Sequence, residues 1–318
     1  MRVLLVKLSS LGDVIHNAPV VSDLVRAVPG IEIDWVTDAP YAGLAALHPG
    51  VKQVFPLRLR ALKKSWWSPS AWTDFLDDRH ALANRYDLIL DTQGLLKSAF
   101  VARAASGPVA GFSASTAREP MAARFYDRRF DVARDQHAVM RNRQLAAAAF
   151  GYALTDAVDY GLKAPDTQAR KASPYCVLLH ATSRPDKEWP LANWIALGKQ
   201  LNARGLKVML PWGSPAEKTV SENIAAALSN ATVPSALSLT EAATLLTGAA
   251  VVAGVDTGLS HLAVALGRPT VGIYVSTQPA LTGLYGGSQA INLGGGTRER
   301  PSAPNADAVY TALTPWLP

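Results

Sequence analysis

The sequence predicts an α/β protein with two doubly wound domains, because both halves of the chain repeat one pattern. Short apolar runs with the length of buried strands alternate with longer segments of helical period. Strands that are separated by helices form a mostly parallel sheet with helices on both faces. The chain has 318 residues, which is long for a single core. Two domains that face each other across a cleft are therefore expected.

The first domain is expected over residues 1–160. Its predicted strands are RVLLVK, IEIDWVT, KQVFPL, YDLILDT and GPVAGF, which are rich in the β-branched and aromatic residues that favour strands. Helical periodicity occupies the segments between and after them, at residues 14–28, 71–84, 95–105 and 136–150. Residues 155–174 are rich in turn formers and have little periodicity, which predicts the linker.

The second domain is expected over residues 173–318, where the same pattern begins again. Its predicted strands are YCVLLH, LKVMLP, AAVVAGV and TVGIYV. Helices are predicted between and after them, at residues 191–203, 215–228, 240–248 and 258–267. A final helix, roughly 304–316, is expected to pack back across the junction toward the first domain.

Composition excludes several classes of protein. No apolar run approaches the roughly 18 residues that span a bilayer. Between Arg2 and Lys7 the apolar stretch is only VLLV, which is too short for the core of a secretory signal, so a cytoplasmic location is expected. The single cysteine, Cys176, excludes an internal disulfide and a cysteine metal cluster.

The net charge of +6 is unevenly distributed. No acid lies between Asp38 and Asp74, but this interval contains Lys52, Arg58, Arg60, Lys63 and Lys64. A basic surface attracts nucleic acid, anionic lipid or an acidic small substrate, and charge alone does not choose among them. An ordinary solvated face also remains open.

The stretch KLSSLGDVIH follows the first predicted strand and contains Asp13. In open α/β sheets, ligands bind outside the carboxyl ends of the strands, and a helix start there favours an anion. The negative charge of the Asp13 carboxylate would repel a phosphate. Three roles remain open for it at this point: it caps the helix, it holds a ribose, or it takes part in proton transfer.

The strongest local signal is VDTGLSHLA, which follows the predicted strand AAVVAGV and opens a helix. Gly258 lets a diphosphate approach the backbone, and the first N–H groups of the helix favour its charge. Asp256, Thr257 and His261 surround this turn. The alternative is an ordinary capped helix with Asp256 or Thr257 as the N-cap.

Two further strand-end stretches support a nucleotide site. HATSRPDKEWP offers the hydroxyls of Thr182 and Ser183 and the ammonium of Lys187, which suit phosphate oxygens. PWGSPAEK places Glu217 where doubly wound folds often hold ribose hydroxyls. The G-x-G-x-x-G fingerprint of nicotinamide enzymes does not follow the first strand. A nucleotide-sugar enzyme therefore fits better than a nicotinamide enzyme.

Six ordered motifs along the whole chain resemble the bacterial lipopolysaccharide heptosyltransferases. They are KLSSLGDVIH, DTQGLLKSA, TAREP, HATSRPDKEWP, PWGSPAE and VDTGLSHLAVAL. The resemblance is greatest to the type I members, which add the first heptose to the Kdo of Kdo2-lipid A. It implies a GT-B fold of two Rossmann-like domains and inverting transfer from ADP-L-glycero-β-D-manno-heptose, with no cofactor and no obligatory metal.

The resemblance also implies roles for individual residues. The general base would be Asp13, and Lys187 would meet the charge on the diphosphate. The first domain would bind the acceptor and the second the donor. The implied donor-binding residues are Thr182, Ser183, Lys187, Glu217, Asp256, Thr257, Gly258 and His261. The implied acceptor-binding residues are Arg58, Arg60, Lys63, Lys64 and Arg118.

The implied location is the cytoplasm, with peripheral attachment at the inner face of the inner membrane and no nucleic-acid partner. Three alternatives remain. A heptosyltransferase of type II, or a related transferase, would use the same donor with a heptosylated acceptor. A nucleotide-sugar epimerase or dehydrogenase would carry a nicotinamide. A noncatalytic basic adaptor would bind the membrane surface without turnover.

Overall fold

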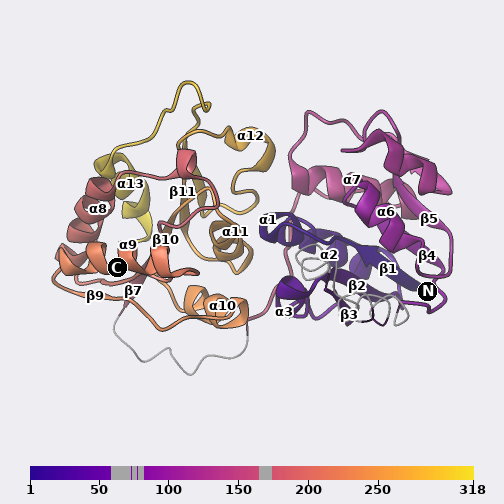
Figure 1. Cartoon of the computed structure of the whole chain (residues 1–318), viewed down its shortest axis with the longest axis horizontal. Coiled ribbons are helices and arrows are strands. Elements are labelled where there is room, and N and C mark those ends of the chain that lie inside the picture. Colours follow the sequence, from indigo (N-terminus) through magenta and orange to yellow (C-terminus); the bar gives the residue numbers. More distant parts are fainter. Residues whose placement is uncertain (59–72, 74–76, 78–81, 165–173) are drawn as a thin grey trace. The chain divides into compact units, whose positions relative to one another are not determined.

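The computed structural model describes residues 1–58, 73, 77, 82–164 and 174–318. The chain divides into two compact units, Met1–Lys163 and Ala164–Pro318. Each unit has one parallel six-stranded sheet (Figure 1). The division between the units lies inside the predicted linker.

The sheet of unit 1 has the strand order β3-β2-β1-β4-β5-β6, and every pair is parallel. Its central strands are continuous apolar runs because both faces are covered, and the residues Val3 to Val6 of β1 are completely buried. The short edge strand β6 was not predicted. The strands are β1 (Arg2–Val6), β2 (Glu32–Asp38), β3 (Val51–Leu57), β4 (Leu88–Asp91), β5 (Val109–Phe112) and β6 (Arg128–Phe130).

The predicted helix over 14–28 is in fact two helices, α1 and α2. Pro19 lies in the first turn of α2, where its missing N–H costs nothing, whereas inside one continuous helix it would break the hydrogen-bond ladder. The predicted helix over 71–84 falls mostly outside the described residues. The helices of unit 1 are α1 (Leu11–Ile15), α2 (Ala18–Ala27), α3 (Ala42–Ala45), α6 (Leu96–Ala102) and α7 (Ala138–Phe150), with 3₁₀ turns η1 (Ala39–Tyr41) and η2 (Pro120–Phe125).

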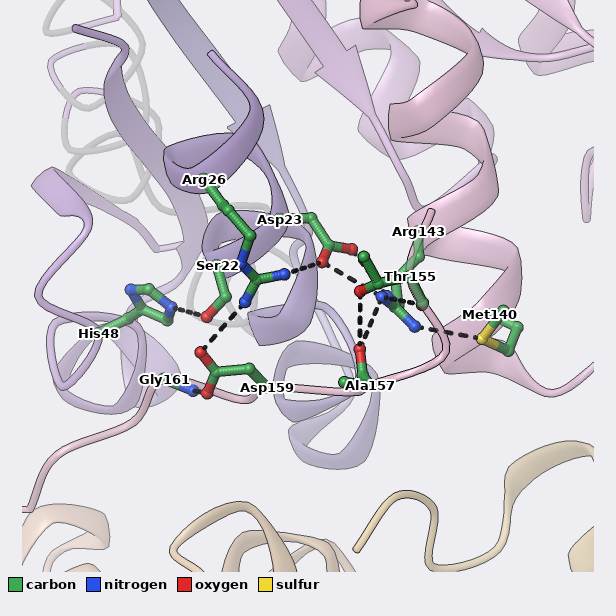
Figure 2. A network of polar contacts seen from close by, with 10 residues as sticks. All are labelled: Ser22, Asp23, Arg26, His48, Met140, Arg143, Thr155, Ala157, Asp159 and Gly161. Carbon is green, nitrogen blue, oxygen red and sulfur yellow. Dashed lines mark hydrogen bonds and ion pairs between the residues drawn. The ribbon is translucent and has the colours of Figure 1, made fainter. Parts of the chain in front are cut away.

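A buried ion pair fixes the end of unit 1 (Figure 2). Arg143 on α7 donates from Nε to Asp23 Oδ2 on α2 at 2.7 Å, and the Arg143 side chain is fully buried. Its Nη2 also donates to the carbonyl oxygens of Thr155 and Ala157, at 2.9 Å each. The guanidinium thereby ties the segment after α7 to the helical layer formed by α2 and α7.

The sheet of unit 2 has the order β12-β11-β10-β7-β8-β9 and is also parallel throughout. The edge strands β9 and β12 were not predicted, because their residues are only partly buried or exposed and lack a continuous apolar run. The strands are β7 (Tyr175–Leu179), β8 (Lys207–Met209), β9 (Ala231–Thr232), β10 (Val251–Val255), β11 (Thr270–Tyr274) and β12 (Ala290–Gly294).

Helices cover both faces of this sheet. The final helix, α13, packs on α8 and β11 of its own unit, where Val309 and Leu313 are fully buried in the core. α10 and α11 pack together on the opposite face. The helices are α8 (Leu191–Ala203), α9 (Pro215–Ala226), α10 (Leu239–Thr247), α11 (Gly258–Ala265), α12 (Pro279–Thr282) and α13 (Ala306–Leu313), with 3₁₀ turns η4 (Pro185–Lys187) and η5 (Thr314–Trp316).

The strand orders create one switch point in each sheet. In unit 1, β1 and β4 are neighbours, but the chain leaves them in opposite directions, toward β2 and β5. In unit 2, β7 and β10 are neighbours, and the chain leaves them toward β8 and β11. The loops that follow such a pair of strands diverge and open a crevice at the carboxyl edge, which is where ligands bind in open α/β sheets.

Candidate active site

Asp256 is the centre of the switch point in unit 2. Its Oδ2 accepts hydrogen bonds from Lys187 Nζ at 2.7 Å and from Thr277 Oγ1 at 2.9 Å. Its backbone carbonyl oxygen accepts from Thr182 Oγ1 at 3.3 Å. The loops after β7, β10 and β11 therefore meet at one residue. The structure brings together Thr182, Lys187 and Asp256, as predicted, and adds Thr277.

Asp256 is held in its ionised form. Burial raises its pKa, but hydrogen bonds from His261 and Lys187, together with the lysine charge, outweigh this and leave the pKa well below its usual range. His261 Nε2 lies 3.9 Å from Asp256 Oδ1. The charge of the Lys187 ammonium is therefore balanced by the Asp256 carboxylate.

A second cation and carboxylate pair stands beside the first. Arg184 donates to Asp186 from Nε at 3.0 Å and from Nη2 at 2.5 Å. Ser276 Oγ donates to Asp186 Oδ2 at 2.6 Å. These bonds lower the pKa of Asp186 to about 2. Sequence reasoning missed Ser276 and Thr277, although two hydroxyl residues shortly after the buried strand β11 are the same signal that marked Thr182.

The start of α11 offers backbone donors at the same edge. Thr257 occupies the N-cap position with an extended backbone, which matches the capped-helix alternative in position, but its side chain makes no capping hydrogen bond; Gly258 is the first helical residue. Ser260 Oγ donates to the carbonyl oxygen of Val255 at 2.9 Å, and a Cβ at Gly254 would collide with that hydroxyl. The helix therefore begins tightly against β10. The Ser260 N–H donates to the Thr257 carbonyl oxygen at 3.1 Å, and the N–H groups of Gly258 and Leu259 precede the first intrahelical bonds of a regular α-helix.

Glu217 faces a pocket of about 260 Å³. It lies in the first turn of α9, where its Oε2 accepts the backbone N–H of Gly213 at 2.7 Å and its own N–H donates to Ser214 Oγ at 3.3 Å. Thr182 also lines this pocket. Ser183 is exposed in the same loop as Thr182. Further lining residues are His180, Ala181, Glu188, Trp189, Leu191, Trp194, Ala216, Val220 and Asn223.

Asp13 lies at the switch point of unit 1, in the first turn of α1. Its Oδ2 accepts from the Ser10 backbone N–H at 2.8 Å and from Ser10 Oγ at 3.3 Å. Arg118 Nη1 lies 3.6 Å from the same oxygen. The prediction of Asp13 as a possible N-cap is wrong, because Ser10 is the N-cap and Asp13 stands three residues later. The carboxylate nevertheless stabilises the helix start.

Lys7 lies beneath this loop and was not predicted as a site residue. Its Nζ donates to the Thr92 carbonyl oxygen at 2.8 Å and to Asn142 Oδ1 at 3.4 Å, and the residue is only 5% exposed. Burial lowers the pKa of Lys7 to about 8, although the charges of Asp13 and Asp91 oppose this shift. A lysine directly after an apolar strand, within the same motif as Asp13, was the available signal.

The predicted acceptor-binding residues are only partly described. Arg118 is about half exposed and adjoins Asp13. Arg58 directly follows β3 at the carboxyl edge of the sheet in unit 1. Arg60, Lys63 and Lys64 lie outside the described residues. Among the residues that the structure describes, no group of three His, Cys, Asp or Glu residues is arranged to hold a metal ion. No helix in this described part is long and apolar enough to cross a membrane.

The sequence matches the family model for glycosyltransferase family 9 (heptosyltransferase) over residues 78–309. The chain is 46% identical over 300 residues to lipopolysaccharide heptosyltransferase 1 of Pseudomonas aeruginosa, an alignment that covers 92% of the chain and 84% of that protein. It is 41% identical over 296 residues to the protein of the same name from Escherichia coli K12, covering 92% of the chain and 93% of that protein.

Solved structures give the same likeness. The E. coli heptosyltransferase WaaC with ADP matches with a TM-score of 0.90 and 38% identity over 99% of both chains. WaaC with ADP-2-deoxy-2-fluoro heptose matches with a TM-score of 0.87, again with 38% identity over 99% of both chains. The E. coli ADP-heptose lipopolysaccharide heptosyltransferase II matches with a TM-score of 0.78 at 21% identity, over 100% of this chain and 98% of that chain, which is a likeness of fold.

Proposed function

The chain belongs to glycosyltransferase family 9, the heptosyltransferases, and has the two-domain GT-B α/β fold, and from this premise we propose its acceptor and its mechanism. It is a glycosyltransferase that transfers heptose from ADP-heptose in the assembly of the lipopolysaccharide inner core. The acceptor is the Kdo of Kdo2-lipid A, which receives the first L-glycero-D-manno-heptose. The enzyme works in the cytoplasm, attached peripherally to the inner face of the inner membrane.

The observation that carries the donor assignment is the convergence at Asp256. Lys187 and Thr277 reach the Asp256 carboxylate from two different strand-end loops, next to the first turn of α11. Thr182, in the same loop as Lys187, donates to the Asp256 backbone carbonyl oxygen. Hydroxyls, an ammonium and free backbone N–H groups are the donors that a diphosphate needs. Glu217, in the adjoining pocket, would accept from the ribose hydroxyls.

The reaction is a direct displacement at the anomeric carbon of the heptose. Asp13 takes the proton of the Kdo hydroxyl while the hydroxyl oxygen forms the new glycosidic bond on the face opposite the leaving ADP. The bond between the anomeric carbon and the phosphate oxygen breaks, and charge builds on the diphosphate. Lys187, the loop hydroxyls and the N–H groups of α11 meet that charge in fixed positions.

Unit 1 supplies the cations for the acceptor. The carboxylate of Kdo and the phosphates of lipid A are anionic. Arg118 next to Asp13 would place such an anion beside the base. The basic residues Arg58, Arg60, Lys63 and Lys64 extend this charge along the chain.

A type II acceptor is the second candidate, and the comparisons favour type I. The curated type 1 relatives cover nearly all of the chain, whereas lipooligosaccharide heptosyltransferase 2 of Haemophilus influenzae is 32% identical over only 31% of the chain and 30% of that protein. The test is purified enzyme with ADP-heptose and either Kdo2-lipid A or heptosyl-Kdo2-lipid A, read by mass spectrometry. Addition of one heptose to Kdo2-lipid A alone is expected. Transfer only to the heptosylated acceptor would overturn the assignment.

The same assay tests the other classes. Turnover into a glycolipid excludes a noncatalytic basic adaptor. Purified protein without nicotinamide absorbance, whose activity is unchanged by added NAD, excludes the epimerase or dehydrogenase. Lys187→Ala is the control for the turnover measurement. It removes the proposed donor-binding cation from unit 2 without changing unit 1, so its transfer of heptose should be weaker than that of wild type.

A further inference from the structure

α6, together with its C-cap residue Arg103, presents a mixed stripe to solvent. Lys97, Phe100 and Arg103 are exposed, and Phe100 is 59% exposed, whereas the residues between them are buried. A spacing of three places these side chains on one face of a helix. The buried face, Ser98, Ala99, Val101 and Ala102, packs on the sheet of unit 1. The outward face thus carries an aromatic ring between two cations.

η2 continues the same surface. Met121 is 48% exposed and Arg124 is exposed, while Ala122 and Ala123 between them are buried. Residues three apart eclipse each other in a 3₁₀ helix, so Met121 and Arg124 share a face. We call the outward residues of the two elements the α6–η2 strip: Lys97, Phe100, Arg103, Met121 and Arg124.

Direct contacts join the two elements. The rings of Phe100 and Phe125 lie 4.7 Å apart between centroids. Arg103 Nε donates to the Phe125 carbonyl oxygen at 2.7 Å, and its Nη atoms pair with Asp127 at 2.8 and 3.0 Å. The strip is therefore a continuous surface of α6 and η2.

The composition of the strip is unlike that of an ordinary solvated face. One exposed apolar side chain needs no explanation, but two large ones on adjoining elements form a patch. Its acids, Glu119 and Asp127, already bind the backbone N–H of Leu96 and the guanidinium of Arg103. Exposed Arg128 and Arg129 follow at once in β6. The charge around the patch is positive.

The strip begins at the loop that carries the candidate base. Lys97 Nζ donates to Ser9 Oγ at 2.7 Å, in the loop between β1 and α1. Arg118, which precedes η2, pairs with Asp13. At 1.5 Å per residue, Phe100 and Arg103 lie about 4.5 and 9 Å further along the axis of α6. The strip therefore extends away from Asp13 along the outside of unit 1.

The geometry points to the α6–η2 strip as the surface that docks on an anionic phospholipid bilayer. This rests on the proposed function, in which the acceptor is a lipid held in a membrane. Phe100 and Met121 enter the headgroup region, and Lys97 and Arg124 pair with lipid phosphates. Charge complementarity selects a membrane over a second copy of this chain, because two copies would bring like charges together. Docking there places the lipid headgroups beside Asp13.

Vesicle sedimentation tests the docking surface. The probes are vesicles of phosphatidylethanolamine with phosphatidylglycerol, and vesicles of phosphatidylcholine alone. The double variant Phe100→Ser with Met121→Ser should bind the anionic vesicles about tenfold more weakly than wild type. Its control, Val25→Ser with Leu281→Ser, changes two exposed apolar residues on α2 and α12 and should bind like wild type.

A charge variant separates the electrostatic part. Arg124→Glu should weaken binding to anionic vesicles by about fivefold or more, and high salt should remove that difference. Lys199→Glu makes the same charge change at an exposed position of α8 and should leave binding unaltered. Unchanged melting temperature and ADP affinity establish that each variant is folded.

Two acceptors distinguish this inference from the proposed function. The Phe100 and Met121 variant should lose turnover on Kdo2-lipid A embedded in vesicles but keep it on a deacylated, water-soluble Kdo acceptor. Vesicle binding equal to that of the control variant would overturn the docking surface. So would a change in oligomeric state without a change in vesicle binding, which would assign the strip to a second copy. Failure of wild type on both acceptors would instead contradict the proposed function.

Discussion

Replacing Asp13 with Asn tests whether its carboxylate removes a proton or only stabilises the start of α1. The amide oxygen of Asn can still accept the Ser10 N–H, which the carboxylate now accepts at 2.8 Å, so the helix contact is preserved. A neutral amide cannot take the proton of the acceptor hydroxyl. We therefore expect kcat to fall by roughly a hundredfold to ten-thousandfold, equivalent to about 3–5 kcal/mol.

The stability of the Asn variant should change little. The ion pair with Arg118 is 3.6 Å long, and the two side chains are 54% and 27% exposed, so its loss costs about 0–1 kcal/mol. Losing a negative charge in the first helical turn adds a few tenths, up to about 1 kcal/mol. A total near 1 kcal/mol lowers the melting temperature by about 2–4 °C. The expected fall in kcat is therefore too large to result from partial unfolding of the variant.

The assay is steady-state transfer from ADP-heptose to Kdo2-lipid A, with ADP affinity measured by calorimetry. Asp159→Asn is a matched control, since Asp159 also accepts a backbone N–H, from Gly161 at 2.9 Å, and lies 3.7 Å from Arg26. It should keep the wild-type kcat. A kcat near wild type for Asp13→Asn would refute the assignment of the base. An equal loss of ADP affinity would show that Asp13 positions substrate.

Three further predictions concern cations. Lys187→Ala should weaken ADP binding by roughly tenfold to a hundredfold, because it removes a charged hydrogen-bond donor; an unchanged calorimetric titration would reject its placement at the diphosphate. Replacing Arg60, Lys63 and Lys64 with Ala should raise the acceptor KM, most strongly at low salt, without changing donor affinity. An equal loss of donor affinity would contradict this. Burial lowers the pKa of Lys7 from 10.5 to about 8, so between these values the unfolded chain holds a proton that the folded chain has released. The contribution of Lys7 to the free energy of unfolding should therefore rise with pH across that window, by up to about 3 kcal/mol. Denaturant titrations at several pH values should show that the free energy of unfolding rises less with pH in Lys7→Met than in the wild type. An equal rise in both proteins would contradict the lowered pKa of Lys7.

The central strands were predictable because the physical cause of the signal is local. β1, β7 and β10 are covered on both faces, so each is a run of apolar residues that needs no knowledge of its neighbours. The predicted helix over 191–203 is confirmed as α8. Its signal is also local, because the buried residues Trp194, Leu197 and Leu201 repeat with helical period. Edge strands bury too little surface to leave such a pattern.

The meeting of Thr182, Lys187 and Asp256 was predictable from the sequence, but the contribution of Thr277 was not. Thr182 and Asp256 were recognised because each follows a buried strand, and parallel strands bring their carboxyl ends to one edge. Strand order is not encoded locally. The sequence therefore did not indicate that β11 lies next to β10, where Thr277 reaches Asp256 across 21 residues of chain. Lys7 was missed because its buried contacts, Thr92 and Asn142, are 85 and 135 residues away.

If the cluster at Asp256 binds the diphosphate, as we propose, its pairing with Lys187 explains how a carboxylate can stand in a site for an anion. A lysine ammonium has three N–H donors, and in the described part of the chain Asp256 takes one of them, at 2.7 Å. This bond fixes the direction of a flexible side chain before the donor arrives, so less conformational freedom is lost on binding. The remaining donors stay available to phosphate oxygens. Thr277 and His261 also contact the Asp256 carboxylate, so its charge is not directed at the lysine alone. An Arg at this position would present a planar fork that matches one carboxylate with two parallel bonds, and it would be more fully engaged by Asp256. The lysine is therefore suited to a site in which one cation serves a resident carboxylate and a transient diphosphate.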